Sequence, residues 1–201
     1  MRMWETEESL ALCGIRAICG ADEAGAGPLA GRVYAAAVML PFGMEIPGVD
    51  DSKKLTEKKR EALFGVIMER AVSYSIQWVE AEEIDRTDIL SARIQAMDRA
   101  ISALNPPAEF ALIDGNRDKG KSWAIAAPHQ CLVKGDGKSL NIAAASILAK
   151  VSRDHYMLEM DALYPQYEFR RHKGYPTARH FALLEEHGPC PIHRRSFLKK
   201  R

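Results

Sequence analysis

The apolar positions of this chain form short runs and helical stripes that alternate along the sequence. Continuous or alternating apolar runs predict strands at residues 16–22, 33–40, 73–79, 110–113, 122–127 and 130–133. Apolar residues at helical spacing predict helices at residues 4–12, 88–104, 141–163 and 178–187, and one that begins near Thr56. The first two strands are close enough to form a hairpin, whereas the run at 110–113 follows a helix, as in parallel sheets. This order predicts an α/β fold with a mixed sheet flanked by helices.

Length and charge favour one main domain with a small basic appendage. We expect the main domain at residues 1–165 and a small helical lobe at residues 166–201 beside the sheet. The net charge is +1, but nine of the 28 Lys and Arg residues lie between residues 168 and 201, with only three of the 27 acids. A basic tail suits a polyanionic partner, although a tail that is merely solvated has the same composition.

Cysteine usage and the N-terminal residues bear on the compartment. The four cysteines lie far apart and form no Cys-x-x-Cys pair, which is typical of reduced thiols in a cytoplasmic protein. The first nine residues carry three glutamates, and no apolar run approaches the roughly 20 residues that span a bilayer. We therefore expect neither a secretory signal nor a membrane partner.

Residues 19–31 place Asp22 and Glu23 at the end of a short apolar run, in a stretch that also holds four glycines and a proline. Such a run is typical of a buried strand that delivers acids to a cleft, while the glycines let another group approach the backbone closely. Adjacent strand residues point to opposite faces, so one of the two acids could act through its main-chain carbonyl unless the strand twists or ends there. A surface turn with solvated acids fits this stretch about equally well.

Two further predicted strands lead to acids that are followed by glycine within two residues, Asp114 and Asp136. Open α/β sheets build their sites at strand ends, so we expect Asp22, Glu23, Asp114 and Asp136 near one edge. Carboxylates brought together repel unless a cation neutralises them, and oxygen ligands without His or Cys suit Mg²⁺ or Mn²⁺. Two such ions about 3.5–4 Å apart would support phosphodiester cleavage. Taken singly, each acid is more often a turn or cap residue.

Seven segments, in order, resemble those of the bacterial ribonuclease HII family, the type 2 ribonucleases H. They are GADEAGAGPLAG (20–31), DSKKL (51–55), IDGN (113–116), KGD (134–136), AAASILAKVSRD (143–154), HKGYPT (172–177) and GPCPIHRRSF (188–197). The resemblance implies an RNase H-like fold, with a catalytic domain at 1–165 and a substrate-binding extension at 166–201. It also implies metal-dependent, endonucleolytic cleavage of RNA in RNA–DNA hybrids and at ribonucleotides embedded in duplex DNA, leaving 5′-phosphate and 3′-hydroxyl ends.

The resemblance also implies roles for individual residues. The catalytic, metal-binding residues would be Asp22, Glu23, Asp114 and Asp136, with Mg²⁺ or Mn²⁺ as cofactor. Tyr175 matches a family tyrosine that packs on the sugar at the RNA–DNA junction, although it could be an ordinary turn tyrosine. Other substrate-binding candidates are Gly25, Ala26, Gly27, Lys53, Lys54, Ser146 and Lys150. The lysines could equally be solvated, and Ser146 is more readily a small residue in helix packing. We expect a monomer that binds hybrids and ribonucleotide-containing duplexes.

Two positions depart from the family pattern. Ala26 stands where the family has arginine, and Arg32 stands where it has proline. Ala26 lacks a cation for a phosphate, so we expect weaker binding and a ribose that is read through the backbone of residues 25–27. Two other functions stay open: a related two-metal DNA nuclease, which an all-DNA duplex would reveal, and a hybrid-binding module without turnover, which would bind without cleaving.

Overall fold

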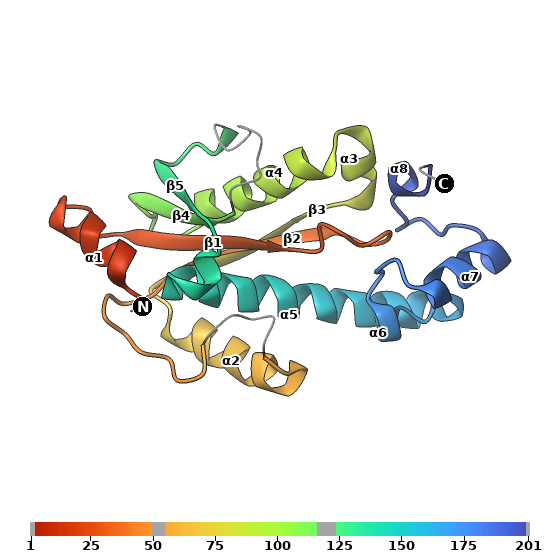
Figure 1. Ribbon diagram of the computed structural model, residues 1–201, viewed down its shortest axis with the longest axis horizontal. Helices are drawn as coiled ribbons and strands as arrows, with labels where there is room; N and C mark the ends of the chain where they lie inside the picture. The colour runs from red at the N-terminus through yellow and green to blue at the C-terminus, as the bar shows by residue number, and fades with distance from the viewer. Residues whose placement is uncertain (1–2, 50–54, 116–123, 200–201) are drawn as a thin grey trace.

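A five-stranded mixed sheet forms the centre of the protein, in the strand order β3-β2-β1-β4-β5 (Figure 1). The computed structural model describes residues 3–49, 55–115 and 124–199. The strands are β1 (Ile18–Ala24), β2 (Val33–Met39), β3 (Ser73–Val79), β4 (Phe110–Asp114) and β5 (His129–Leu132). Strands β1, β2 and β3 pair antiparallel, whereas β4 pairs parallel with both β1 and β5. The mixed sheet and the first hairpin are therefore confirmed.

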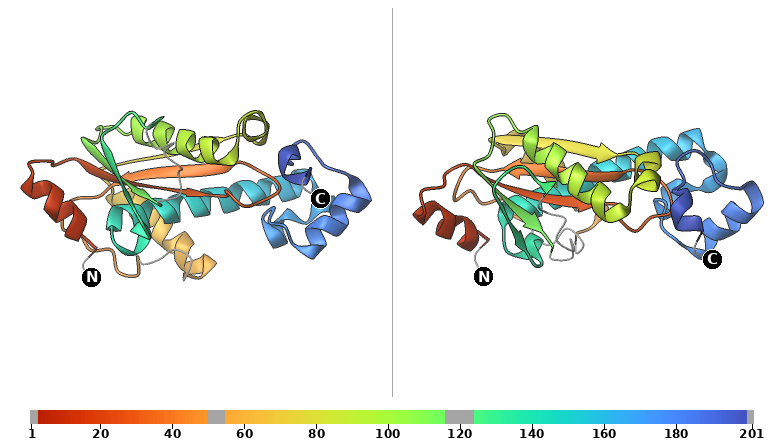
Figure 2. Two further views of the ribbon diagram at one scale, coloured as in Figure 1. Left: turned by 45° about the horizontal axis from the view of Figure 1, so that its top comes forward. Right: turned by 90° about the horizontal axis from the view of Figure 1, so that it is seen from above.

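Helices cover both faces of this sheet (Figures 1 and 2). On one face α4 (Ile89–Ser102) packs against β1, β2 and β3, and on the other α5 (Leu140–Leu163) packs against β1 and β2. Helix α2 (Glu57–Arg70) packs on α5, and α1 (Glu5–Leu12) precedes β1. Both long helices begin at side-chain caps, Asp88 for α4 and Ser139 for α5, which accept hydrogen bonds from the first-turn N–H groups.

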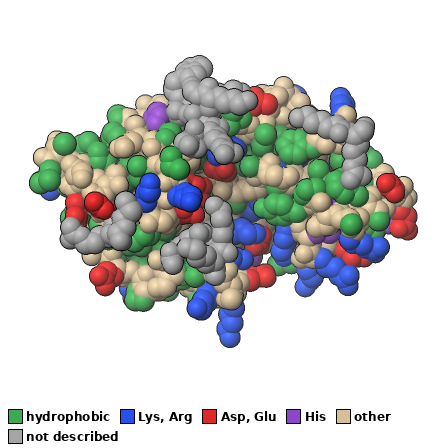
Figure 3. All heavy atoms as spheres, in the orientation of Figure 1, with side chains coloured by type: hydrophobic (Ala, Val, Ile, Leu, Met, Phe, Trp, Pro, Cys, Tyr) green, Lys and Arg blue, Asp and Glu red, His purple; other side chains and the backbone are tan. Residues whose placement is uncertain are grey.

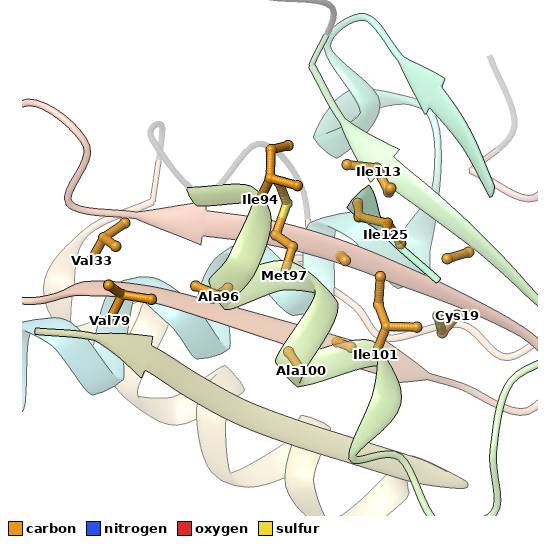
Figure 4. Close-up of a cluster of buried hydrophobic side chains, with 14 of the residues drawn as sticks. Cys19, Val33, Val79, Ile94, Ala96, Met97, Ala100, Ile101, Ile113 and Ile125 are labelled. Atoms are coloured by element: carbon orange, nitrogen blue, oxygen red, sulfur yellow. The ribbon is translucent and has the colours of Figure 1, made fainter. Parts of the chain in front are cut away.

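Small side chains on β2 let both helices approach closely. Ala35 and Ala37 face the α4 core, part of which Figure 4 shows, whereas Ala36 and Val38 face the α5 core. Gly20 of β1 likewise allows close packing of α5, because a Cβ atom there would lie 2.2 Å from the backbone nitrogen of Ile142. Helix α5 therefore starts directly against β1, which brings its first turns to the acidic end of the strand.

One prediction of secondary structure is wrong. The described part of the predicted strand 122–127 is irregular: Ile125 is buried in the α4 core, and the Ala126 N–H group donates to Asp98 Oδ1 of α4 instead of to a strand. A tertiary contact has therefore overridden an apolar run that looked like a strand. The short helix α3 (Ala81–Arg86), which follows β3, has no counterpart among the predicted elements.

The C-terminal lobe lies at the distal end of α5 (Figures 1 and 2). It contains η4 (Pro165–Tyr167), α6 (Phe169–His172), α7 (Ala178–His187) and α8 (Arg195–Leu198). Its core residues Tyr167, Phe169 and Leu183 form one cluster with Tyr34 of β2 and Tyr156 of α5. The lobe is thus packed onto the end of the sheet and of α5, and a domain boundary at residue 165 stays a prediction.

All four cysteines are free thiols, of which Cys19 and Cys190 are buried. Among the described helices, none combines the length and apolar character that crossing a bilayer requires.

Candidate active site

A cleft of about 430 Å³ opens at the acidic end of β1 and β4. Its walls come from β1 and the following loop, from β4, from α2 and α5, and from the C-terminal lobe. It is lined by Asp22, Glu23, Ala24, Gly25, Ala26, Gly27, Arg60, Asp114, Ser146, Lys150 and Tyr175. In Figure 3, acidic side chains near the centre of the molecule are flanked by Lys and Arg side chains on both sides. The fold thus gathers most of the predicted site residues from distant parts of the chain.

Strand register places the acids on two faces of the sheet. Ala21 pairs with Ile113 in the parallel ladder, so Asp22 and Asp114 follow each other in register on neighbouring strands. Asp22 lies opposite Ala36, which faces α5, and Glu23 lies opposite Ala35, which faces α4. The alternation expected from adjacent strand positions is therefore present, and the two carboxylates meet different helices.

Asp22 is buried on the α5 side. Its Oδ1 accepts the Glu23 N–H group at 2.7 Å, and its carboxylate also accepts the Ser146 hydroxyl. Burial raises the pKa of Asp22 well above its ordinary value, and the nearby carboxylates of Glu23 and Asp114 raise it further. Ser146 therefore does more than fill space in helix packing, because its hydroxyl stabilises the ionised form of Asp22.

Glu23 is held on the α4 side by an arginine. Arg93 Nη2 lies 2.7 Å from Glu23 Oε1, while Glu23 Oε2 is buried without a hydrogen-bond partner. Burial raises the pKa of Glu23, the Arg93 guanidinium lowers it, and Asp114 raises it, with a net upward shift. Arg93 is thus a positive charge of the protein itself at the edge of the acidic site, and the sequence patterns had not indicated it.

Asp114 and Asp136 are linked through a glycine turn. The Gly135 N–H group donates to Asp114 Oδ1 at 2.6 Å. A Cβ atom at Gly135 would lie 2.6 Å from Ile142 Cδ1 and 3.2 Å from that same Oδ1, so a larger residue would have to displace the end of the Ile142 side chain. Asp136 is buried in the 3₁₀ turn η3 (Gly135–Gly137), after β5 has ended at Leu132, and it is not among the residues that line the cleft. Asp136 therefore lies in a turn before α5 and not at the end of a strand.

Two buried arginines hold the loop that follows β1. Arg194 is fully buried and donates to four carbonyl oxygens of this loop, those of Gly25 (2.7 Å), Ala26 (3.2 Å), Pro28 (2.9 Å) and Gly31 (2.9 Å). Burial, with a smaller contribution from Arg153, lowers the pKa of Arg194 to about 9. Arg153 donates to the carbonyl oxygens of Ala30, Arg32 and Lys173. The Arg194 guanidinium therefore lies beneath the loop and holds its backbone from inside the protein.

The remaining predicted residues lie at the rim or outside the described residues. The Tyr175 ring is 41% exposed and lies over the Arg153 guanidinium, 5.7 Å from centroid to Cζ. Lys150 Nζ is 2.5 Å from Asp154 Oδ1, so this lysine lines the cleft as part of an ion pair. Arg60 of α2 adds a second cation there, which sequence reasoning missed. Lys53 and Lys54 fall outside the residues that the structure describes.

The set of oxygen donors at this acidic edge is of the chemical type that binds hard divalent cations. Its side-chain atoms are carboxylate oxygens, which Mg²⁺ and Mn²⁺ prefer, and the buried Glu23 Oε2 has no hydrogen-bond partner among the described residues. Across residues 3–49, 55–115 and 124–199, no three His, Cys, Asp or Glu side chains are grouped closely enough to hold an ion as they stand. Asp22, Glu23 and Asp114 are each turned to a donor from the protein instead.

A carboxylate edge on a mixed sheet, beside cationic side chains, suits metal-assisted cleavage of phosphodiesters, as in nucleases. Comparison with known proteins agrees. The family model of Ribonuclease HII matches residues 19–200. Ribonuclease HII of Dechloromonas aromatica (strain RCB) is 56% identical over 180 residues, 90% of each chain. Ribonuclease HII of Caldicellulosiruptor saccharolyticus is 50% identical over 196 residues, 98% of this chain and 94% of the relative.

A solved structure gives the same result for the fold. The crystal structure of the ribonuclease H2 from Pyrococcus horikoshii OT3 has a TM-score of 0.74 at 25% identity, covering 90% of this chain and 93% of that chain. The chain belongs to the ribonuclease HII family. It is therefore an RNase H-type endonuclease, of a family that requires divalent metal ions.

Proposed function

We propose that the cleft cuts the RNA strand of RNA–DNA hybrids and duplex DNA beside single embedded ribonucleotides, leaving 5′-phosphate and 3′-hydroxyl ends. The residues that hold Mg²⁺ or Mn²⁺ are Asp22, Glu23, Asp114 and Asp136. Divalent cations bound there supply the Lewis acidity that activates water and stabilises the leaving oxygen. The observation that carries the proposal is the buried Asp22, whose pKa is raised by burial and by two neighbouring carboxylates. Concentrated negative charge of this kind is stabilised by a cation.

Three of these carboxylates, those of Asp22, Glu23 and Asp114, each contact a hydrogen-bond donor of the protein. Asp114 is oriented by the Gly135 N–H group, which leaves the direction of its carboxylate fixed. Glu23 offers the unpaired Oε2 while Arg93 keeps Oε1. Asp22 would offer its carboxylate to a cation from beside the Ser146 hydroxyl. These carboxylates would thus hold the metal at the edge where the protein has already collected them.

Arg194 determines which backbone groups of the loop face the substrate. Its guanidinium takes the carbonyl oxygens of Gly25 and Ala26 from inside the protein. In a planar trans peptide the N–H group points opposite to the C=O group, so the N–H groups of Ala26 and Gly27 point away from Arg194. Both residues line the cleft, where such donors suit a ribose 2′-hydroxyl or a phosphate oxygen. The loop thus reads ribose through its backbone, without a charge on Ala26.

The rim of the cleft supports substrate binding without base specificity. The Tyr175 ring packs on the sugar at the junction between RNA and DNA, and aromatic packing of this kind tolerates every base. Lys150, Lys53 and Lys54 contact phosphates of the duplex. Exposed arginines of the C-terminal lobe, Arg170, Arg171 and Arg179, extend the basic surface beyond the cleft. The chain acts as a monomer in the cytoplasm, and its free thiols fit a reducing compartment.

A labelled duplex with one ribonucleotide tests this function against its rivals. The protein is incubated with Mg²⁺, with Mn²⁺ or with chelator, and the cut position and end groups are mapped. We expect metal-dependent cutting beside the ribonucleotide and no cutting of the all-DNA duplex. Equal cutting of the all-DNA duplex would indicate a DNA nuclease, and metal-independent binding without cutting would indicate a binding module.

A further inference from the structure

Two buried histidines form a hydrogen-bonded chain that ends on the backbone of Tyr175. His180 Nδ1 lies 3.0 Å from the Tyr175 carbonyl oxygen, and His180 Nε2 lies 3.0 Å from His193 Nε2. At the far end, the Cys190 N–H group donates to His193 Nδ1 at 3.0 Å. The two histidines are 0% and 2% exposed, so water does not complete these contacts. Every ring nitrogen of these two histidines must therefore find its hydrogen-bond partner within the protein.

These contacts permit one arrangement of protons. A carbonyl oxygen can only accept, so His180 carries its proton on Nδ1 and accepts at Nε2. His193 accepts at Nδ1 from a backbone N–H group, so its proton is on Nε2, where it is donated to His180. A second proton on either ring would set two N–H groups against each other. All three hydrogen bonds of His180 and His193 can therefore form only when both rings are neutral and are present as opposite tautomers.

The third histidine of the lobe fixes the same turn from its other side. His172 Nδ1 accepts the Gly174 N–H group at 3.2 Å, and His172 Nε2 donates to the Tyr167 carbonyl at 2.8 Å. Its ring stacks on His180 with centroids 4.3 Å apart and an angle of 19°. The turn that carries Tyr175 is thus bound at two consecutive residues by neutral imidazoles.

We propose that the His193–His180 pair is a positioning device for Tyr175, holding its backbone so that the ring stands at the rim of the cleft. The ring lies over the Arg153 guanidinium, and it faces Gly27, where a Cβ atom would lie 3.8 Å from Tyr175 Cε1. The backbone of His193 also pairs with that of Ala30, which follows residues 25–27 of the glycine loop. His193 thus contacts both the loop and the histidine that holds Tyr175, beside the Leu29 N–H group, which donates to the Gly174 carbonyl at 2.8 Å. This inference rests on the substrate contact proposed for Tyr175.

Two variants of His180 separate its two hydrogen bonds. In His180→Asn the amide nitrogen lies near the former Nδ1 and keeps the donor to Tyr175, whereas in His180→Gln the amide lies near the former Nε2 and keeps the contact with His193. We expect His180→Gln to weaken binding of a single-ribonucleotide duplex about tenfold, and His180→Asn by less than about threefold. Affinity is measured in chelator, and kcat and KM with metal, where the defect should appear in KM. Melting temperatures of the two variants serve as the control.

A double-mutant cycle and a spectrum distinguish positioning from folding. In the Tyr175→Ala background, His180→Gln should add no further loss of affinity, because it acts through that ring. Long-range ¹H–¹⁵N spectra of the wild type at pH 7 should show His180 protonated at Nδ1 and His193 at Nε2. Two identical tautomers, or a charged ring, would overturn the inference. So would a full additional loss in the Tyr175→Ala background. If Tyr175→Ala alone leaves affinity unchanged, the contact proposed for Tyr175 is wrong, and the inference falls with it.

Discussion

Arg93 Nη2 lies 2.7 Å from Glu23 Oε1, at the edge of the carboxylate site proposed to hold divalent cations. The guanidinium comes from α4, on the face of the sheet opposite to the helix that contacts Asp22. A permanent positive charge at this position lowers the cost of gathering the acids before any ion binds. The same charge repels an incoming ion, so Arg93 balances the stability of the empty site against its affinity for metal.

Replacing Arg93 should shift this balance. Arg93→Gln keeps a donor but removes the charge, and we expect Mn²⁺ affinity to rise several-fold, together with a lower melting temperature in chelator. Titration calorimetry at pH 8, where the raised pKa of Glu23 matters least, measures the affinity directly. Arg93→Lys keeps the charge and is the matched control. Weaker binding in Arg93→Gln would mean that Arg93 orients Glu23 for the ion instead of competing with it.

Asp22 is expected to support activity at a cost in stability. Its pKa is raised by burial and by like charge, so its ionised form destabilises the fold at neutral pH. Asp22→Asn should therefore lower the cleavage rate by at least about 100-fold while the melting temperature in chelator rises. Rate assays with Mg²⁺ and thermal melts in chelator test the two parts separately. A variant that is slow and also less stable would mean that Asp22 is mainly structural.

The other two carboxylates give a simpler expectation. Asp114→Asn and Asp136→Asn each keep the size of the side chain but remove a charge, and we expect rate losses of at least about 100-fold with little change in folding. Single-turnover rates and circular dichroism check both points. Asp136 is the sharper test, because it is buried outside the cleft lining. Cleavage at the wild-type rate by Asp136→Asn would remove this residue from the site.

The sequence could predict the sheet and the acids because their signals are local. Strand-length apolar runs and acids next to glycine are visible in a few consecutive residues, and Asp22, Glu23 and Asp114 lie at the ends of such runs. The groups that organise them are not visible in this way. Arg93 reaches Glu23 from another helix, and Arg194 reaches the loop from near the opposite end of the chain. Charged residues are usually exposed, so nothing in the sequence indicated that Arg194 would be buried against carbonyl groups.

The glycine loop provides a matched pair of substitutions. Gly25 has φ +96°, and a Cβ atom there would lie 2.2 Å from Arg153 Nε. Gly27 has neither constraint, since its nearest contact would be the Tyr175 ring at 3.8 Å. Gly25→Ala should cost about 1–3 kcal/mol of stability and displace the loop, whereas Gly27→Ala should change stability by less than about 0.5 kcal/mol. Denaturant titrations of both variants decide this, and equal stabilities would contradict the packing of Arg153 under Gly25.

The histidine chain predicts a loss of stability in mild acid. Burial lowers the pKa of His180 and of His193 from about 6.5 to about 4. The unfolded chain therefore binds more protons between these values, so the stabilising contribution is complete above pH 6.5 and is lost as the pH falls toward 4. Among the described residues, the titratable groups that contact this pair are His172, whose pKa is also lowered, and the Cys190 thiol and the Tyr167 phenol, whose pKa values are raised by burial.

A comparison of two proteins measures this contribution. The free energy of unfolding of the wild type and of a His180→Asn, His193→Gln variant is followed from pH 7.5 to 4.5. The difference between the two proteins should shrink by roughly 1–2 kcal/mol per histidine on acidification, because the variant lacks the titrating rings. A difference that does not depend on pH would mean that these histidines have the same pKa in the folded and the unfolded protein.

Ala26 gives the last prediction, because its peptide faces the substrate while its side chain carries no charge. Arg194 holds the Gly25 and Ala26 carbonyls inward, so a longer side chain at position 26 should leave the outward N–H groups in place. Ala26→Arg adds a phosphate contact, which should tighten binding to hybrid and all-DNA duplexes alike and steepen the salt dependence by about one unit of slope. The preferred cut beside a single ribonucleotide should stay where it is. Affinity is measured against salt concentration in chelator, cuts are mapped with metal, and Ala26→Gln controls for size. If Ala26→Arg creates a ribonucleotide selectivity that the present chain lacks, backbone reading of the ribose is insufficient and the function proposed for this loop is wrong.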